Sequence, residues 1–360
     1  MRRPCPRPGQ AGAALLLVLI LVAALSLALA GALPLARLEV AGESTEAASV
    51  MARARVDSGL LLAAVLLARD ASANQFDHPG EAWAAFFASD AERTRIMAAG
   101  EVTDRAVADL FADDGLSGTV SDETGKIPVN ALAGANAPVH ARVLRDLLVG
   151  PAFRMSAVEA TRLVLAIRDW VDVDTDASTS DSLGEGFQKG VVGAESPYYA
   201  ALGRDRLPPN AAMLSLGELL QVRGVTPGLY DGTGGGPGLR DLLTVHGSGD
   251  EGYNVNTAPE AVLAALAWQN GESTALAFAR DVAAFRSQRG NAAALENPEW
   301  VRFTLSGYRN IVLSGISLTT QGRFFLADLT GMSGAARARL MAWIRRDGDG
   351  KVVVVARRAW

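Results

Sequence analysis

The feature that most constrains the fold is an uncharged apolar run near the N-terminus, "AGAALLLVLILVAALSLALAGAL", from Ala11 to Leu33. A helix of about 20 apolar residues is long enough to cross a bilayer. Three arginines precede the run in "MRRPCPRPGQ", and such residues favour a cytoplasmic location for that end of the chain. The run therefore predicts one membrane-spanning helix with the bulk of the chain on the far side of the membrane.

The residues after this run extend the predicted helix. The segment "ARLEVAGESTEAASVMARARVDSGLLLAAVLLARD" contains no proline and consists mostly of good helix formers, as far as about Ser72. We therefore expect one long helix that emerges from the membrane. Two alternatives remain: a cleaved secretory signal, for which "ALAGAL" offers a small-residue site, and a plain membrane anchor.

The rest of the chain divides into three parts. Residues 74–129 look mixed and end in "SGTVSDETGKIPVNAL", which predicts a strand or a hairpin that turns at Gly125 and Lys126. Residues 131–274 are mostly helical, because apolar residues recur every three or four positions in segments such as "MSAVEATRLVLAIRDWV". Strands return after about Asn297, with a turn at "DGDG". The predicted fold class is α+β: a long N-terminal helix and a small antiparallel sheet, with a large inserted all-α domain.

Charge and reactive residues exclude several functions. The formal net charge of −5 argues against a general affinity for nucleic acid. The only cysteine is Cys5, so a chain without its first residues has no thiol and suits an oxidising compartment. The histidines are His78, His140 and His246, and no serine lies in a G-x-S-x-G segment. We therefore expect a protein that is not an enzyme, and a secreted enzyme of unknown chemistry remains the weakest alternative.

Five segments in register resemble one known family. They are "SDETGKIPVNAL" (121–132), "IRDWVDVD" (167–174), "ESPYYAALG" (195–203), "LSLGELLQVRGVTPGLY" (214–230) and "YNVNTAPEAVLAAL" (253–266). Together they closely resemble general secretion pathway protein K, the large minor pseudopilin of type II secretion systems. The resemblance covers most of the chain from Gly12 to about Leu266 and is weaker beyond it.

The resemblance implies how the N-terminus is processed. Prepilin peptidase would cut between Gly12 and Ala13, and the new N-terminus would be methylated. Major pseudopilins carry a glutamate at the fifth mature position, where this chain has Leu17, and the K class characteristically lacks that acid. The implied parts are a leader peptide (1–12), a transmembrane pilin helix (13–70), the first part of a pseudopilin α/β domain (71–130), an inserted helical domain (131–290) and the second part of the pseudopilin domain (291–360).

The resemblance also implies a place in an assembly. The chain would be a single-pass protein of the bacterial inner membrane with its C-terminal bulk in the periplasm. It would cap the tip of the pseudopilus and help to initiate its assembly for protein export across the outer membrane. Its implied partners are the minor pseudopilins of the I and J classes, the major pseudopilin, prepilin peptidase and the inner membrane, with no nucleic acid.

A long acidic loop, "VDVDTDASTSDSLGEGFQKGVVGAESPYYAALG", begins at Val171 and has almost nothing apolar to bury. Asp172, Asp174 and Asp176 match the first three ligand positions of an EF-hand, but Ala177 and Leu183 occupy the glycine and glutamate positions. The loop is therefore not an EF-hand. Its oxygen donors, without histidine or cysteine, argue against zinc.

The K class binds calcium in its inserted domain, so the resemblance implies that Ca²⁺ folds this loop. The expected metal ligands are Asp172, Asp174, Asp181 and Glu195, taken from both ends of the loop. The alternative is a solvated acidic loop. An insert, "ASTSDSLGEGFQKGVVG", makes the loop longer than the usual spacer of the family.

A second alternative for the whole chain is a membrane-anchored periplasmic DNA-binding protein. Residues 214–230 and 253–266 resemble helix-hairpin-helix modules, in which backbone N–H groups of a glycine-rich hairpin approach phosphate. Here the hairpin is "VRGVTPGLYDG", where Pro227 lacks a donor and Arg223 is the only nearby base. We therefore interpret these helices as scaffold.

Overall fold

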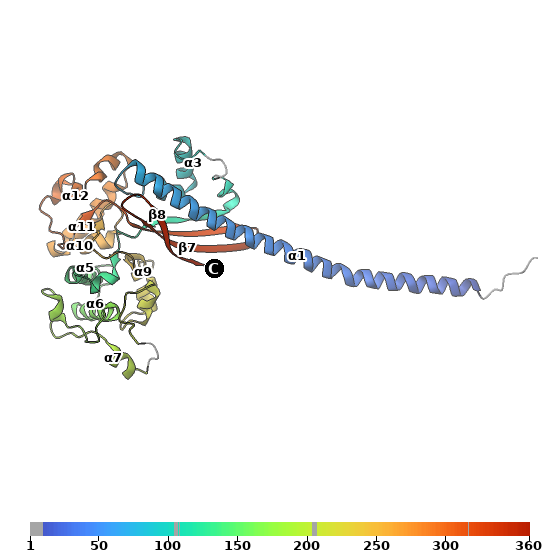
Figure 1. Ribbon diagram of the computed structural model, residues 1–360, viewed down its shortest axis with the longest axis horizontal. Helices are drawn as coiled ribbons and strands as arrows, with labels where there is room; N and C mark the ends of the chain where they lie inside the picture. Colours follow the sequence, from blue (N-terminus) through green and yellow to red (C-terminus); the bar gives the residue numbers. More distant parts are fainter. Residues whose placement is uncertain (1–9, 104–106, 108, 204–206, 316) are drawn as a thin grey trace, which may run out of the picture.

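A computed structural model describes residues 10–103, 107, 109–203, 207–315 and 317–360, and within these ranges it describes the side chains of residues 15–30 and from 45 onward, apart from residue 113. Figure 1 shows one long helix, α1, that projects away from a body in which a sheet and a group of helices lie at its C-terminal end. The expected fold class is confirmed: a long N-terminal helix, an antiparallel sheet and a large helical insertion.

Helix α1 (Gln10–Ala73) is 64 residues long. Its C-terminal half presents a buried stripe that includes Ala52, Val56, Ala63 and Leu67, spaced so that they share one helix face. In contrast, its leucines and valines between residues 15 and 29 are exposed. Among the described residues, no helix combines the length and the apolar character needed to cross a membrane.

The buried stripe of α1 packs against an antiparallel sheet with the strand order β1-β6-β7-β8. The strands are β1 (Leu116–Asp122), β6 (Phe324–Ser333), β7 (Ala336–Arg346) and β8 (Val352–Ala359). Alternate residues of β6, Phe325, Ala327 and Leu329, are buried with the helix stripe in one core. Gly331 permits the close contact, because a Cβ atom there would lie 2.3 Å from the carbonyl oxygen of Ala52.

Two short helices, α2 (Ala82–Ala88) and α3 (Asp90–Ala98), complete this smaller core together with Phe111, which precedes the 3-10 helix η1 (Ala112–Asp114). Trp83 and Phe86 of α2 are fully buried in it, and Trp83 contacts the ring of Phe325 edge-on at 5.1 Å between centroids. The sheet, α1 and these helices therefore form one packed unit.

The chain between β1 and β6 forms a second and larger core. Its helices are α5 (Ala137–Val149), α6 (Ala157–Val171), α7 (Ser196–Ala201), α8 (Pro227–Asp231), α9 (Leu239–Leu242), α10 (Glu260–Leu266), α11 (Glu272–Arg286) and α12 (Trp300–Phe303). Its 3-10 helices are η2 (Val129–Ala133), η3 (Ser180–Leu183), η4 (Leu216–Gln221), η5 (Trp268–Asn270), η6 (Arg289–Glu296) and η7 (Ser306–Tyr308). Two parallel pairs of two-residue strands, β2 (Ile127–Pro128) with β3 (Leu243–Thr244) and β4 (Tyr253–Asn254) with β5 (Leu318–Thr319), bring distant segments together.

Of the two alternatives predicted here, the strand is confirmed as β1, and the hairpin around Gly125 is wrong. β1 pairs with β6, whereas β2 pairs in parallel with β3. β1 and β2 therefore belong to different sheets and do not form a hairpin. The turn between them carries the chain from the smaller core into the larger one. Gly125 is required there because a Cβ atom would lie 2.6 Å from the backbone nitrogen of Ala258.

The return to the smaller domain also differs from the expected boundary at residue 291. Leu295, Trp300, Val301 and Leu313 are buried in the larger core, and the sheet resumes only with β6. The segment around "FTLSGYRNIV" alternates like a strand, but it forms α12 and η7 instead. Burial against the helical core decides the structure of this stretch.

Candidate metal centre

Three of the predicted metal ligands meet at one end of α6. One oxygen atom from each of Asp172, Asp174 and Glu195 lies within 4.8 Å of the others. Asp172 is the C-terminal cap of α6, and its extended backbone turns the chain away from the helix. Glu195 caps the N-terminus of α7, where its Oε2 accepts a hydrogen bond from the Ser196 N–H at 3.1 Å. The two ends of the loop therefore lie close together.

Two further oxygen-bearing side chains join this cluster. Asp169 lies one helical turn before Asp172, and its Oδ1 accepts a hydrogen bond from the Ser178 N–H at 2.9 Å. Asn210 donates through Nδ2 to the backbone carbonyl of Asp174. Sequence analysis missed both residues. The three-residue spacing within α6 could have indicated Asp169, whereas Asn210 lies in a segment with no such pattern.

Four oxygen atoms of the cluster are buried and have no hydrogen-bond partner in the part of the chain that the structure describes. They are Asp169 Oδ2, Asp172 Oδ1, Glu195 Oε1 and Asn210 Oδ1. Buried polar atoms without partners are rare and costly, and a set of carboxylate and amide oxygens is what a hard cation such as Ca²⁺ prefers. The donor set therefore fits calcium.

The electrostatics of the cluster also favour a bound cation. Burial, followed by the negative charges of Asp174, Asp169 and Glu195, raises the pKa of Asp172 to about 7. Arg168 provides only a weak compensating ion pair, because its Nε lies 3.8 Å from Asp172 Oδ2. Several like charges thus face each other at short range, an arrangement that a cation would stabilise.

The fourth predicted ligand, Asp181, is not part of this group. It lies exposed in η3, away from the cluster that the other three form. The loop is also less polar inside than its sequence suggests, since Leu183, Phe187 and Val191 are buried in the larger core. These side chains anchor the middle of the loop, and the acidic cluster lies at its two ends.

The predicted cleavage position lies far from this centre. Gly12 and Ala13 fall in the first turns of α1, outside the part of the chain whose side chains are described.

In the segment considered as a DNA-binding hairpin, the only nearby basic side chain is that of Arg223, and it contacts other residues of the protein. Arg223 donates to the carbonyl of Gly193 at 3.2 Å, and its guanidinium lies 4.4 Å from the centroid of the Tyr198 ring. Its backbone N–H donates to the Tyr199 hydroxyl at 3.0 Å. Arg223 thus holds the segment before α7 in place.

Comparisons with known proteins agree with this description. Residues 125–232, which contain the whole acidic cluster, match the family model described as "Type II secretion system (T2SS), protein K". The chain is 30% identical over 201 residues to type II secretion system protein K of Aeromonas hydrophila, a match that covers 55% of this chain and 54% of the relative. The chain therefore aligns with about half the length of this curated relative.

The fold is shared with a solved structure. A chain in the crystal structure of the GspK-GspI-GspJ complex of the type 2 secretion system from enterotoxigenic Escherichia coli has a TM-score of 0.56 and 17% sequence identity, over 90% of this chain and 99% of that chain. The family match is consistent with the expectation of a structural protein. This chain therefore resembles protein K of the type II secretion system, and its protein K domain is the segment, residues 125–232, that matches the family model.

Proposed function

We propose that this protein is a minor pseudopilin of the K class, which caps the tip of the periplasmic pseudopilus and helps to initiate its assembly. The observation that carries the proposal is the protein K domain at residues 125–232, inserted between strands β1 and β6 of a sheet that packs on one long helix. The curated relative and the shared fold support it.

The N-terminal half of α1 supports a membrane location. Its exposed leucines and valines, such as Leu17 and Leu27, need an apolar environment. The inner membrane would supply it before assembly, and helices of neighbouring pseudopilins would supply it afterwards. The body of the protein, at the other end of α1, would then lie in the periplasm (Figure 1).

The size of the insertion supports a position at the tip. The helices from α5 to α12 form a core larger than that of the sheet domain and lie beside the end of α1 (Figure 1). A shaft of closely packed subunits leaves little room for such a body, whereas the tip leaves it free. The partners would be minor pseudopilins of the I and J classes, as in the complex that the related solved structure describes.

The cluster at the end of α6 would bind Ca²⁺. Asp172, Asp174 and Glu195 would hold the ion, with Asp169 and Asn210 beside them. The bound charge would compensate the buried carboxylates and fix the start of α7 against the end of α6. The role is structural.

Labelling of filaments tests the tip assignment. Pseudopili would be overproduced in a secretion-competent strain that carries the full chain with a C-terminal epitope, and the epitope would be located by immunogold electron microscopy. We expect gold at one end of each filament and loss of secretion when the gene is deleted. Gold distributed along the shaft would contradict the tip assignment.

A further inference from the structure

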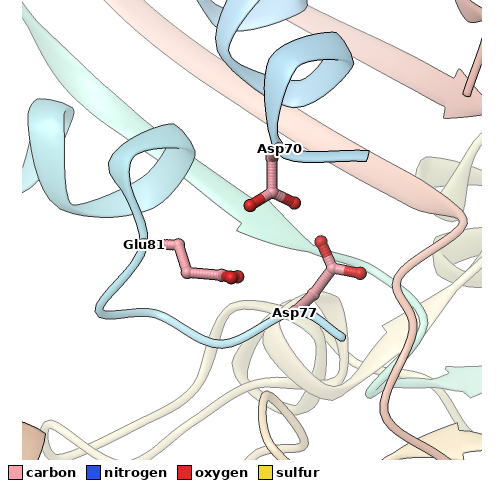
Figure 2. Close-up of side chains that lie close together, drawn as sticks. All are labelled: Asp70, Asp77 and Glu81. Carbon is pink, nitrogen blue, oxygen red and sulfur yellow. The ribbon is translucent and has the colours of Figure 1, made fainter. Parts of the chain in front are cut away.

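A second group of acids lies at the junction of the two cores, outside the protein K domain. One oxygen atom from each of Asp70, Asp77 and Glu81 lies within 4.8 Å of the others. Figure 2 shows their carboxyl groups converging from three sides: Asp70 from the last turns of α1, Asp77 from the connecting segment and Glu81 from the start of α2. Such proximity places like charges at short range.

One buried oxygen atom of the group has no hydrogen-bond partner among the described residues. Asp77 is 0% exposed, and its Oδ1 has no hydrogen-bond partner among the residues that the structure describes. Its other oxygen, Oδ2, accepts a hydrogen bond from the Gly322 N–H at 2.7 Å and pairs with Arg346. The side chain is thus fixed on one side, while its free oxygen faces the group, where a buried acceptor is costly unless something binds it.

Arg346 neutralises the group only in part. It pairs with Asp77 Oδ2 and with Asp70 Oδ2, the latter at 3.1 Å, and donates to the Gly322 carbonyl at 2.8 Å. Glu81 forms no ion pair with any described residue, and its Oε2 accepts hydrogen bonds from the His78 N–H and the Trp83 indole at 2.9 and 3.1 Å. Burial raises the pKa of Asp70 and of Asp77 to about 7. When all three carboxyl groups are ionised, the one guanidinium leaves two negative charges, the charge that one divalent cation neutralises.

The donors and their surroundings suit a hard ion. Every side chain of the group offers oxygen, which is the preference of Ca²⁺ rather than of zinc or copper. None of the three acids lines the neighbouring cavity of about 470 Å³, but Glu81 lines another of about 710 Å³ together with His78 and Arg286. This second cavity would admit the water molecules that complete a coordination shell of six to eight oxygens.

We propose that Asp70, Asp77 and Glu81 form a second divalent-cation site, suited to Ca²⁺, at the junction between α1, α2 and the strand that returns from the larger core. The ion would link the end of α1 to the start of α2. Through Asp77, whose backbone N–H also donates to the Thr320 carbonyl at 2.7 Å, it would link both to the segment before β6. It would thereby fix the larger core relative to the long helix.

Calorimetric titration of the purified, metal-free full chain in detergent with CaCl₂ tests this proposal. The wild type should bind two ions per chain, Asp174→Asn one, and the double variant Asp174→Asn/Glu81→Gln none. Glu101→Gln removes a partly exposed acid outside both groups and should leave the stoichiometry unchanged. Loss of all binding in Asp174→Asn alone would overturn the second site. Loss of all Ca²⁺ binding in the single variant Glu81→Gln would support the second site and contradict the site in the loop.

Terbium luminescence gives a second measurement that does not depend on removing an acid of the group. The Trp83 indole nitrogen lies 3.1 Å from Glu81 Oε2, so Tb³⁺ bound there would be excited through Trp83. In the Asp174→Asn background we expect tryptophan-excited emission that Ca²⁺ displaces and that Trp83→Phe strongly reduces. Absence of emission in Asp174→Asn, or emission that Trp83→Phe leaves intact, would contradict the proposal.

Discussion

At the scale of single residues, Asp174 and Asp181 carry the same charge on the same exposed loop, yet only Asp174 belongs to the acidic cluster. We predict that Ca²⁺ raises the melting temperature of the wild-type chain and that Asp174→Asn removes the part of this rise that the loop site contributes. At a calcium concentration of 100 times Kd, mass action adds about 2.7 kcal/mol to the free energy of unfolding. Thermal unfolding with calcium and with chelator measures the effect.

The matched control for this prediction is Asp181→Asn, which should melt like the wild type under both conditions. Trypsin gives a second readout, because Lys189 is exposed near the middle of the same loop and should be cut faster in chelator. If chelator changes neither the melting temperature nor the cleavage rate, the loop is simply solvated. An equal effect of the two substitutions would show that net charge, and not a site, is responsible.

His140 provides a prediction on pH dependence. It is buried, with Nδ1 3.1 Å from the Tyr253 hydroxyl, and burial lowers its pKa below 6.5, against the opposing charges of Asp250 and Glu251. Because the folded state takes up this proton less readily than the unfolded state, His140 costs stability as the pH falls below about 6.5.

The variant His140→Gln should therefore lose less stability than the wild type between about pH 7 and about pH 5. At neutral pH it should be less stable by about 1 kcal/mol if the bond to Tyr253 is lost. Urea unfolding at both pH values, in chelator, measures the difference. A wild type and a variant with the same pH dependence would show that this group does not titrate between the two states.

Some residues of the candidate metal site could be predicted from the sequence, and others could not. Asp172, Asp174 and Glu195 could be proposed because the family resemblance implied a calcium site and these acids lie at the two ends of a long loop. Asp181 shares this pattern, and only the fold separates it from the cluster. The group at Asp70 had no comparable pattern, because its acids are spread over a helix end and a connecting segment.

At the scale of elements, the contact between α1 and β6 depends on a residue without a side chain. A Cβ atom at Gly331 would meet the Ala52 carbonyl oxygen at 2.3 Å, and this is helix backbone that cannot move aside alone. Gly331→Ala should therefore destabilise the protein by about 1–3 kcal/mol, the usual cost of overpacking. Denaturant unfolding of the purified chain measures it.

Gly348 provides the control for this substitution. It lies in the turn between β7 and β8, and a Cβ atom there would have no neighbour within 4 Å. Gly348→Ala should therefore leave stability almost unchanged. Comparable losses from both alanine variants would contradict the account of how the long helix packs on the sheet.

Elements with a strong periodic pattern could be predicted from the sequence. The long helix, α5, α6 and the turn between β7 and β8 all form where residue spacing and turn residues indicate. Elements that depend on distant partners could not be predicted. β2 is only two residues long and pairs with β3 more than a hundred residues away, and η7 lies in a stretch whose alternation resembles that of a strand. In both cases burial against the larger core decides the outcome.

At the scale of the whole molecule, the proposed function requires one processing event at the N-terminus. We predict that Gly12→Val leaves the precursor uncut and abolishes secretion, because the peptidase would recognise a residue without a side chain at this position. Immunoblots and a secretion assay in a complemented deletion strain measure both effects. Gly9→Val serves as the control and should be processed normally. Normal processing of Gly12→Val would move the site elsewhere or remove the basis for the proposal.

The central claim, that this chain is a processed pseudopilin, is tested most directly by the intact mass of the full-length protein extracted from membranes of its host. We predict the mass of residues 13–360 with one added methyl group, and fragmentation that places the methyl on the amino group of Ala13. A mass that corresponds to cleavage after Ala30 or Ala32, or to the uncut chain, would contradict the claim.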